Sequence, residues 1–225
     1  MLCAIAVMFL TATSRAAMAG ASPVRWKIPL GPAVAPAGVL TRLSGGDNNM
    51  ALTVDDGASV SVVGSFAQFC RDTGTRLTFF VTGANPSWSV NAPALRPMVD
   101  SGQVQMANHT WSHPRLNSLG LDAVADQIRR DADFLKNTYG VHNAAIDRVA
   151  ADQGYTTITM WSSTLGDSAP ESEASLLANA SRAFQPQQIV LAHANMPAIT
   201  HCYPQLIDLI RSRNLNTVTL NDVSA

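Results

Sequence analysis

Glycines that separate helix-like segments from short apolar runs constrain the fold of this chain more than any other feature. Helical spacing in residues 61–72 and 92–100 ends at Gly74 and Gly102, and Gly154 follows a third such segment. Glycine adopts the left-handed conformation that closes a helix at little cost, so each glycine marks the step from a helix to a strand. Repeated βα units predict an α/β fold with a parallel sheet or barrel. Strands are predicted near Val54, Phe80, Val104, Ile158, Val190 and Val218.

The first predicted strand ends in two adjacent carboxylates and a glycine, Asp55-Asp56-Gly57. The apolar residues 51–54 before them are typical of a buried strand. In βα folds the chemistry lies at the carboxyl ends of the strands, where these acids fall. Neighbouring residues of an extended strand point to opposite sides, so we expect the two acids to differ in role. One would bind a metal ion and the other would handle protons.

Two histidines, His109 and His113, follow the third predicted strand. Residues four apart can face one ligand on a helical turn, and neutral imidazole is the commonest nitrogen ligand of zinc. The spacing alone fits an ordinary polar loop equally well. The position of both histidines at the same end of the fold as the acids favours a metal site. Two histidines and one aspartate leave positions open for water and substrate, as a catalytic metal requires.

A further apolar run, residues 189–192, ends in His193. Taken alone, this motif fits a hydrogen-bonded core histidine. Because it ends a strand as the other two motifs do, we interpret His193 as a proton donor.

The composition limits the classes of partner. The chain has 225 residues, of which 47% are hydrophobic and 14% are charged, enough for one large core. The formal net charge of −1, with no basic block, argues against nucleic acid and against an anionic membrane surface. In an oxidising compartment Cys70 and Cys202 could form a disulfide, and the sequence leaves their pairing open.

Three segments are expected along the chain. Residues 1–19 are predicted to be a signal peptide, because residues 2–10 are apolar and Ala17-Met18-Ala19 has the form of a cleavage site. A buried helix is the alternative, and the apolar run is too short to span a membrane. Residues 20–49, rich in proline, are predicted to form an arm that packs on a catalytic domain of residues 50–225. Export would make the protein secreted or part of the cell envelope.

Three motifs together resemble a known family. The motifs are Thr53-Val54-Asp55-Asp56-Gly57, His109-Thr110-x-x-His113 and Leu191-x-His193. They are similar to the first, second and fifth motifs of the polysaccharide deacetylases. This family is the carbohydrate esterase family 4 type related to the chitooligosaccharide deacetylase of nodulation. The resemblance implies a distorted (β/α) barrel of seven strands. It also implies metal-dependent removal of acetyl groups from N-acetylated sugars of a peptidoglycan- or chitin-like polysaccharide.

Residue roles follow from the resemblance. Asp56, His109 and His113 would hold the divalent metal, usually zinc. Asp55 would be the base that takes a proton from the attacking water, and His193 would be the acid that protonates the departing amine. Asp167 would support His193. Trp161 and Leu191 would be apolar walls for the acetyl methyl group, although both residue types are equally suited to a core.

One motif of the family is missing. Its Arg-Pro-Pro-Tyr-Gly segment should follow the helix predicted around residues 121–135, but Lys136-Asn137-Thr138 stand there, and residues 143–152 also have helical spacing. Tyr139-Gly140 is interpreted as a remnant that binds substrate, and the barrel is expected to be one strand short. Two alternatives therefore stay open: an impaired family member that only binds glycan, and a different enzyme that holds ferrous iron with two histidines and a carboxylate.

Overall fold

The computed structural model describes residues 6–7, 38–139 and 157–223. Alternating strands and helices form its first half: β3 (Asn49–Asp56), α1 (Val60–Thr73), β4 (Leu77–Val81), α2 (Pro86–Asp100), β5 (Val104–Asn108) and α3 (Leu121–Tyr139). The second half contains β6 (Thr157–Thr159), β7 (Ser163–Thr164), α5 (Glu173–Ala183), β8 (Ile189–His193), α6 (Ala198–His201), α7 (Tyr203–Ser212), β9 (Asn216–Val218) and α8 (Leu220–Val223). Each strand predicted from the sequence is present.

The described strands form one sheet that curls toward closure. Its order is β2-β6-β1-β5-β4-β3-β8-β7, with β9 paired to β3. The central pairs β3–β4, β4–β5 and β3–β8 are parallel, as the βα pattern predicted. β6 and β7 lie near opposite ends of this order, yet only residues 160–162 separate them along the chain. These three residues can bridge at most about 15 Å between the two strands. The ends of the sheet must therefore approach each other. This curvature gives the distorted barrel.

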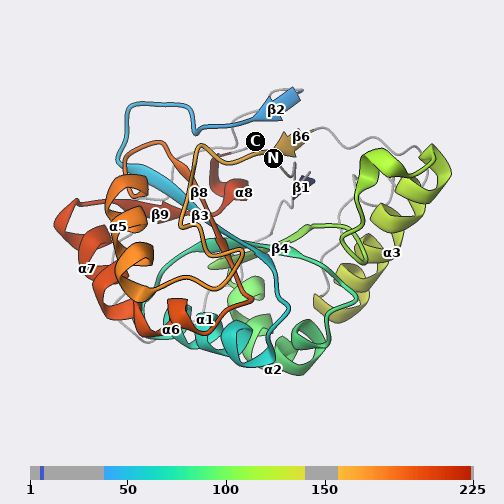
Figure 1. The fold of residues 1–225 in the computed structure, drawn as a ribbon, viewed down its shortest axis with the longest axis horizontal. Coiled ribbons are helices and arrows are strands. Elements are labelled where there is room, and N and C mark those ends of the chain that lie inside the picture. Colours follow the sequence, from blue (N-terminus) through green and yellow to red (C-terminus); the bar gives the residue numbers. More distant parts are fainter. Residues whose placement is uncertain (1–5, 8–37, 140–156, 224–225) are drawn as a thin grey trace.

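Two apolar layers follow from the alternation of side chains along the strands. Met50, Leu52 and Val54 of β3 belong to the large cluster that includes buried residues of the surrounding helices. Ala51 belongs to a smaller cluster together with Phe80 and residues of β5 and β8. The helices surround the strands on three sides (Figure 1). At their carboxyl ends, β3, β5 and β8 carry Asp56, Asn108 and His193.

The helices differ from the predictions mainly in length. α1 has Ser59 as its N-cap and Gly74, at φ 72°, as its C-cap. Gly102 also has a positive φ, 75°, just after α2. α2 was expected to begin at residue 92, but it begins at Pro86, which suits a first helical position because its missing N–H has no helical partner there. Gly154 lies outside the described residues.

Two segments from the N-terminal part of the chain join the sheet beside β6. Within the arm, β2 (Gly38–Leu40) pairs in parallel with β6, so the arm adds a strand as well as packing on the domain. β1 (Ala6–Val7), from the predicted signal segment, pairs antiparallel with both β5 and β6. Among the described strands, β1 therefore holds the position between β5 and β6. The helix predicted at residues 143–152 and Gly140 lie outside the described residues.

Both cysteines that were considered for a disulfide, Cys70 and Cys202, are free and buried. Among the described helices, none combines the length and the apolar character needed to cross a membrane.

Candidate active site

The turn after β3 brings both acids to one place. Asp55 and Asp56 lie 3.6 Å and 3.3 Å, through one carboxylate oxygen each, from Nε2 of His109. The expectation that the two side chains point to opposite sides is wrong here. Asp56 has a left-handed φ of 67°, which breaks the alternation of the strand. Both carboxylates therefore reach the same site.

Donors at the N-terminal end of α2 hold this unusual turn. The carbonyl oxygen of Asp56 accepts hydrogen bonds from Asn85 Nδ2 at 2.8 Å and from Trp88 Nε1 at 3.0 Å. The next residue, Gly57, has a φ of 76°, and a Cβ there would lie 2.3 Å from the Trp88 ring. The glycine is required both by its conformation and by the close approach of the indole.

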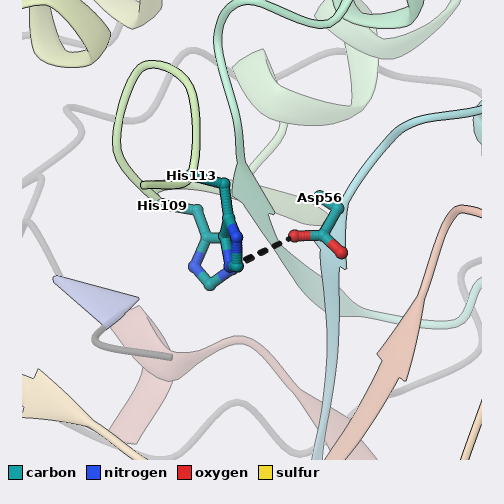
Figure 2. A group of neighbouring side chains, drawn as sticks. All are labelled: Asp56, His109 and His113. Carbon is teal, nitrogen blue, oxygen red and sulfur yellow. Dashed lines mark ion pairs between the residues drawn. The ribbon is translucent and has the colours of Figure 1, made fainter. Parts of the chain in front are cut away.

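The two histidines were expected on a helical turn, but they lie on a loop. His109 follows β5 directly, while Thr110 and His113 have φ values of 71° and 52°. The loop is closed by two hydrogen bonds: Asn108 Oδ1 accepts from the Thr110 N–H at 2.9 Å, and Thr110 Oγ1 accepts from the His113 N–H at 3.1 Å. The histidine rings come to lie side by side, 4.7 Å apart, and both face Asp56 (Figure 2).

The distances in this group fit a divalent ion. Asp56 Oδ1 lies 3.3 Å from His109 Nε2 and 3.7 Å from His113 Nε2, and the ligand atoms of all three residues lie within 4.8 Å of one another. Donors about 2.0–2.1 Å from a tetrahedral zinc ion are about 3.3 Å apart. Asp56 Oδ1 is buried and accepts no well-directed hydrogen bond. Because an unpaired buried carboxylate oxygen is costly, a cation at this point satisfies it.

The electrostatics of the group also favour a positive charge. Burial raises the pKa of Asp56, but the contacts with His109, Asn195 and His113 outweigh it and hold this pKa well below its usual value. Burial lowers the pKa of His109, but the charges of Asp55 and Asp56 raise it above its ordinary value. Burial and the neighbouring His109 lower the pKa of His113. The two carboxylates thus favour a positive charge beside His109, where a metal ion would lie.

Asp55 and His193 stand next to each other on paired strands. They are direct partners in the register of β3 and β8, and Asp55 is buried. Burial raises the pKa of Asp55 to about 6, against the opposing charges of His109 and His193. The charges of Asp56 and Asp167 add to the effect of burial and raise this pKa further.

Asp167 reaches His193, as the sequence-based role requires. Its Oδ1 lies 3.0 Å from His193 Nδ1, and its Oδ2 accepts a hydrogen bond from the His193 N–H at 2.9 Å. Burial lowers the pKa of His193, but the hydrogen bond and charge of Asp167, with the charges of Asp55 and Asp56, raise it above its ordinary value. His193 is therefore oriented by a buried carboxylate and tends to stay protonated.

A small cavity of about 10 Å³ lies beside Asp55, with Trp161, Leu191 and Phe80 among its walls. A cavity of this size admits a group about as large as one water molecule. Leu191 is buried, and Trp161 is partly buried against the smaller apolar cluster, which includes Phe80. Both residues predicted as apolar walls thus lie at the site.

Tyr139 does not lie at the site, contrary to the prediction that it binds substrate. Its side chain is 1% exposed, belongs to the large apolar cluster and donates a hydrogen bond to the Trp88 carbonyl at 2.6 Å. The reason is the helical spacing of α3, which places Tyr139 four residues after the buried Leu135, on the face that packs inward.

Two residues of the site were missed from the sequence. Asn195 donates through Nδ2 to Asp56 Oδ2 at 2.8 Å, and no sequence signal marks it. Asp131 of α3 is fully buried, and its Oδ2 accepts a hydrogen bond from the His109 N–H at 3.3 Å. Asp131 falls on the apolar stripe of its helix, three residues after Ile128 and four before Leu135. A carboxylate on that stripe was the available signal, because buried acids need partners.

The structure is that of an α/β protein whose curled sheet carries an Asp-His-His group at the carboxyl ends of its strands. Comparison with known proteins identifies the family. The sequence model of the polysaccharide deacetylases matches residues 43–158. The chain therefore belongs to the polysaccharide deacetylase family.

Solved structures give the same fold. A peptidoglycan N-acetylglucosamine deacetylase superposes with a TM-score of 0.69 at 20% sequence identity, covering 84% of this chain and 93% of that chain. A CE4 family pseudoenzyme from Bacillus anthracis gives a TM-score of 0.66 at 18% identity, and the match covers 86% of this chain and 69% of the pseudoenzyme. A family 4 carbohydrate esterase from Streptomyces lividans, solved with acetate, gives 0.60 at 25% identity, covering 75% and 91%. Similar structures thus include both enzymes and a pseudoenzyme.

Proposed function

We propose that this protein is a metal-dependent hydrolase that removes acetyl groups from N-acetylated sugars of a polysaccharide, with Zn²⁺ as its ion. One observation carries the proposal: the oxygen of Asp56 that lacks a hydrogen bond faces Nε2 of His109 and of His113, beside Asp55. Two nitrogens and one oxygen suit zinc and leave positions open. A bound ion would supply a Lewis acid that activates water and stabilises negative charge on the acetamide oxygen.

The protein side chains supply the proton transfers. Asp55, with a pKa of about 6, accepts a proton from the attacking water near neutral pH. His193, held by Asp167, donates a proton to the departing amine nitrogen. The cavity between Trp161 and Leu191 receives the acetyl methyl group next to Asp55. The site thus divides proton removal and proton donation between two adjacent strands.

The polymer is proposed by class. A peptidoglycan- or chitin-like polysaccharide fits the family, and one similar structure is a peptidoglycan N-acetylglucosamine deacetylase. Such polymers lie outside the cytoplasm, and we propose export by a signal peptide at residues 1–19, whose removal would take β1 out of the sheet.

The test is acetate release from N-acetylglucosamine oligomers with zinc or cobalt added. Asp55→Asn should reduce release by about 100-fold or more, the usual contribution of a general base. Equal release from the two proteins would remove Asp55 as the base. Metal analysis of the purified protein provides a second test, because iron together with oxygen-dependent turnover would contradict a hydrolase.

A second function is favoured by one observation. Lys136-Asn137-Thr138 stand where the family motif has an arginine and two prolines, and a CE4 family pseudoenzyme is among the similar structures. A protein that binds glycan without deacetylating it would show oligomer binding by calorimetry and no acetate release with any metal. Acetate release that depends on Asp55 would exclude this alternative.

A further inference from the structure

Asn195 connects two loops of the site. It lies two residues after His193, on the loop that follows β8. Its Oδ1 accepts a hydrogen bond from the Ala58 N–H at 2.9 Å, and its Nδ2 donates to Asp56 Oδ2 at 2.8 Å. One side chain thus holds both the backbone of the turn after β3 and the carboxylate of the proposed metal ligand.

The two oxygens of Asp56 consequently have different surroundings. Oδ2 is occupied by the Asn195 amide, whereas Oδ1 is buried, accepts no well-directed hydrogen bond and faces the two histidine Nε2 atoms. We propose that Asn195 is a positioning residue that occupies Oδ2 and so makes Asp56 a ligand through Oδ1 alone. This inference rests on the proposed metal-dependent function.

The coordination number gives this arrangement its chemical consequence. A carboxylate that binds through one oxygen contributes one ligand, so Asp56 and the two histidines leave open positions for water and substrate. Without the amide, Oδ2 is free to turn toward the ion and to occupy one of those positions. Hydrogen bonds to the ligands of a metal typically contribute about 10–100-fold to metal affinity.

The loop around Asn195 should keep its fold when the side chain is replaced. The Ala194 N–H donates to the Asp55 carbonyl at 3.0 Å, and the Ser59 N–H donates to the Ala194 carbonyl at 3.1 Å. These backbone hydrogen bonds do not involve the Asn195 side chain. Substitution of Asn195 therefore tests the side-chain contacts themselves.

The experiment compares metal binding by the wild type, Asn195→Ala and Asn195→Leu. Zinc affinity is measured by competition with a chelating dye, and cobalt binding by its visible spectrum, whose intensity falls as the coordination number rises. Both variants should bind zinc about 10-fold or more weakly and show a weaker cobalt band. Asn221→Ala is the matched control, because Asn221 accepts a hydrogen bond from Gln105 Nε2 at 2.9 Å, at the start of β5 and away from the site. Its affinity and spectrum should equal those of the wild type.

The outcomes separate the two proposals. A wild type that binds neither metal would overturn the proposed function, and this inference with it. Wild-type binding with unchanged affinity and spectrum in both Asn195 variants would overturn only the inference. If the variants do not fold, a crystal structure of the wild type with zinc decides the matter: one Asp56 oxygen on the ion supports the proposal, and two oxygens refute it.

Discussion

Replacement of Gly57 by alanine tests how the turn after β3 is built. The new Cβ would lie 2.3 Å and 2.4 Å from two carbons of the Trp88 ring, far inside normal contact. Trp88 is buried and cannot move aside without displacing Phe79, which it contacts edge to face. The indole also donates to the carbonyl of Asp56. We therefore expect Gly57→Ala to destabilise the fold and to disturb the proposed metal ligand.

The magnitude has two parts. A left-handed conformation costs an alanine about 1–2 kcal/mol. Overpacking of a buried site costs about 1–3 kcal/mol more. Gly102 isolates the first part, because its φ of 75° matches the 76° of Gly57 and a Cβ there meets nothing within 4 Å. Gly57→Ala should thus lower the free energy of unfolding by about 2–5 kcal/mol and Gly102→Ala by about 1–2 kcal/mol.

Denaturant unfolding followed by circular dichroism measures both free energies. Each kcal/mol corresponds to about 2–4 °C in Tm for a chain of this size, so the difference between the variants is also visible in thermal scans. In a Trp88→Leu background the added cost of Gly57→Ala should fall to that of Gly102→Ala. Equal destabilisation by Gly57→Ala and Gly102→Ala in the wild-type background would refute the role assigned to Trp88.

Three further predictions concern the core and the site. Tyr139→Phe should lower the free energy of unfolding by about 0.5–1.5 kcal/mol through loss of its hydrogen bond to Trp88, with acetate release unchanged; lost activity at unchanged stability would restore a substrate role. Asp167 raises the pKa of His193, so Asp167→Asn should lower that pKa. The alkaline limb of the profile of kcat against pH should then move to lower pH, because the acid must be protonated to act. An unmoved limb would exclude His193 as the acid held by Asp167. Zinc at 100 times its Kd should stabilise the fold by about 2.7 kcal/mol, measured as a rise in Tm that a chelator reverses; the same rise in Asp56→Asn would place the ion elsewhere.

The sequence was sufficient for six of the nine described strands and for the position of the acids and histidines, but it did not predict β1, β2 or β7. Helical segments that end at glycines and are followed by apolar runs predicted the parallel sheet, and parallel strands place their carboxyl ends at one edge. Asp55, His109 and His193 each stand at such an end, so their proximity followed from local pattern alone. The family motifs pointed to the same residues, and the match over residues 43–158 agrees.

Contacts between distant segments decided the rest. Asp56 turns into the site because Asn85 and Trp88, about thirty residues later in the chain, hold its carbonyl group. Tyr139 is buried because α3 packs its apolar face inward, which overrides its likeness to a motif. Asn195 reaches Asp56 because β8 lies beside β3, although the two residues are 139 positions apart. The sequence determined which side chains stand at the edge of the sheet, because strand ends are local features. The orientation of these side chains depends on hydrogen bonds that form only when the strands and helices come together.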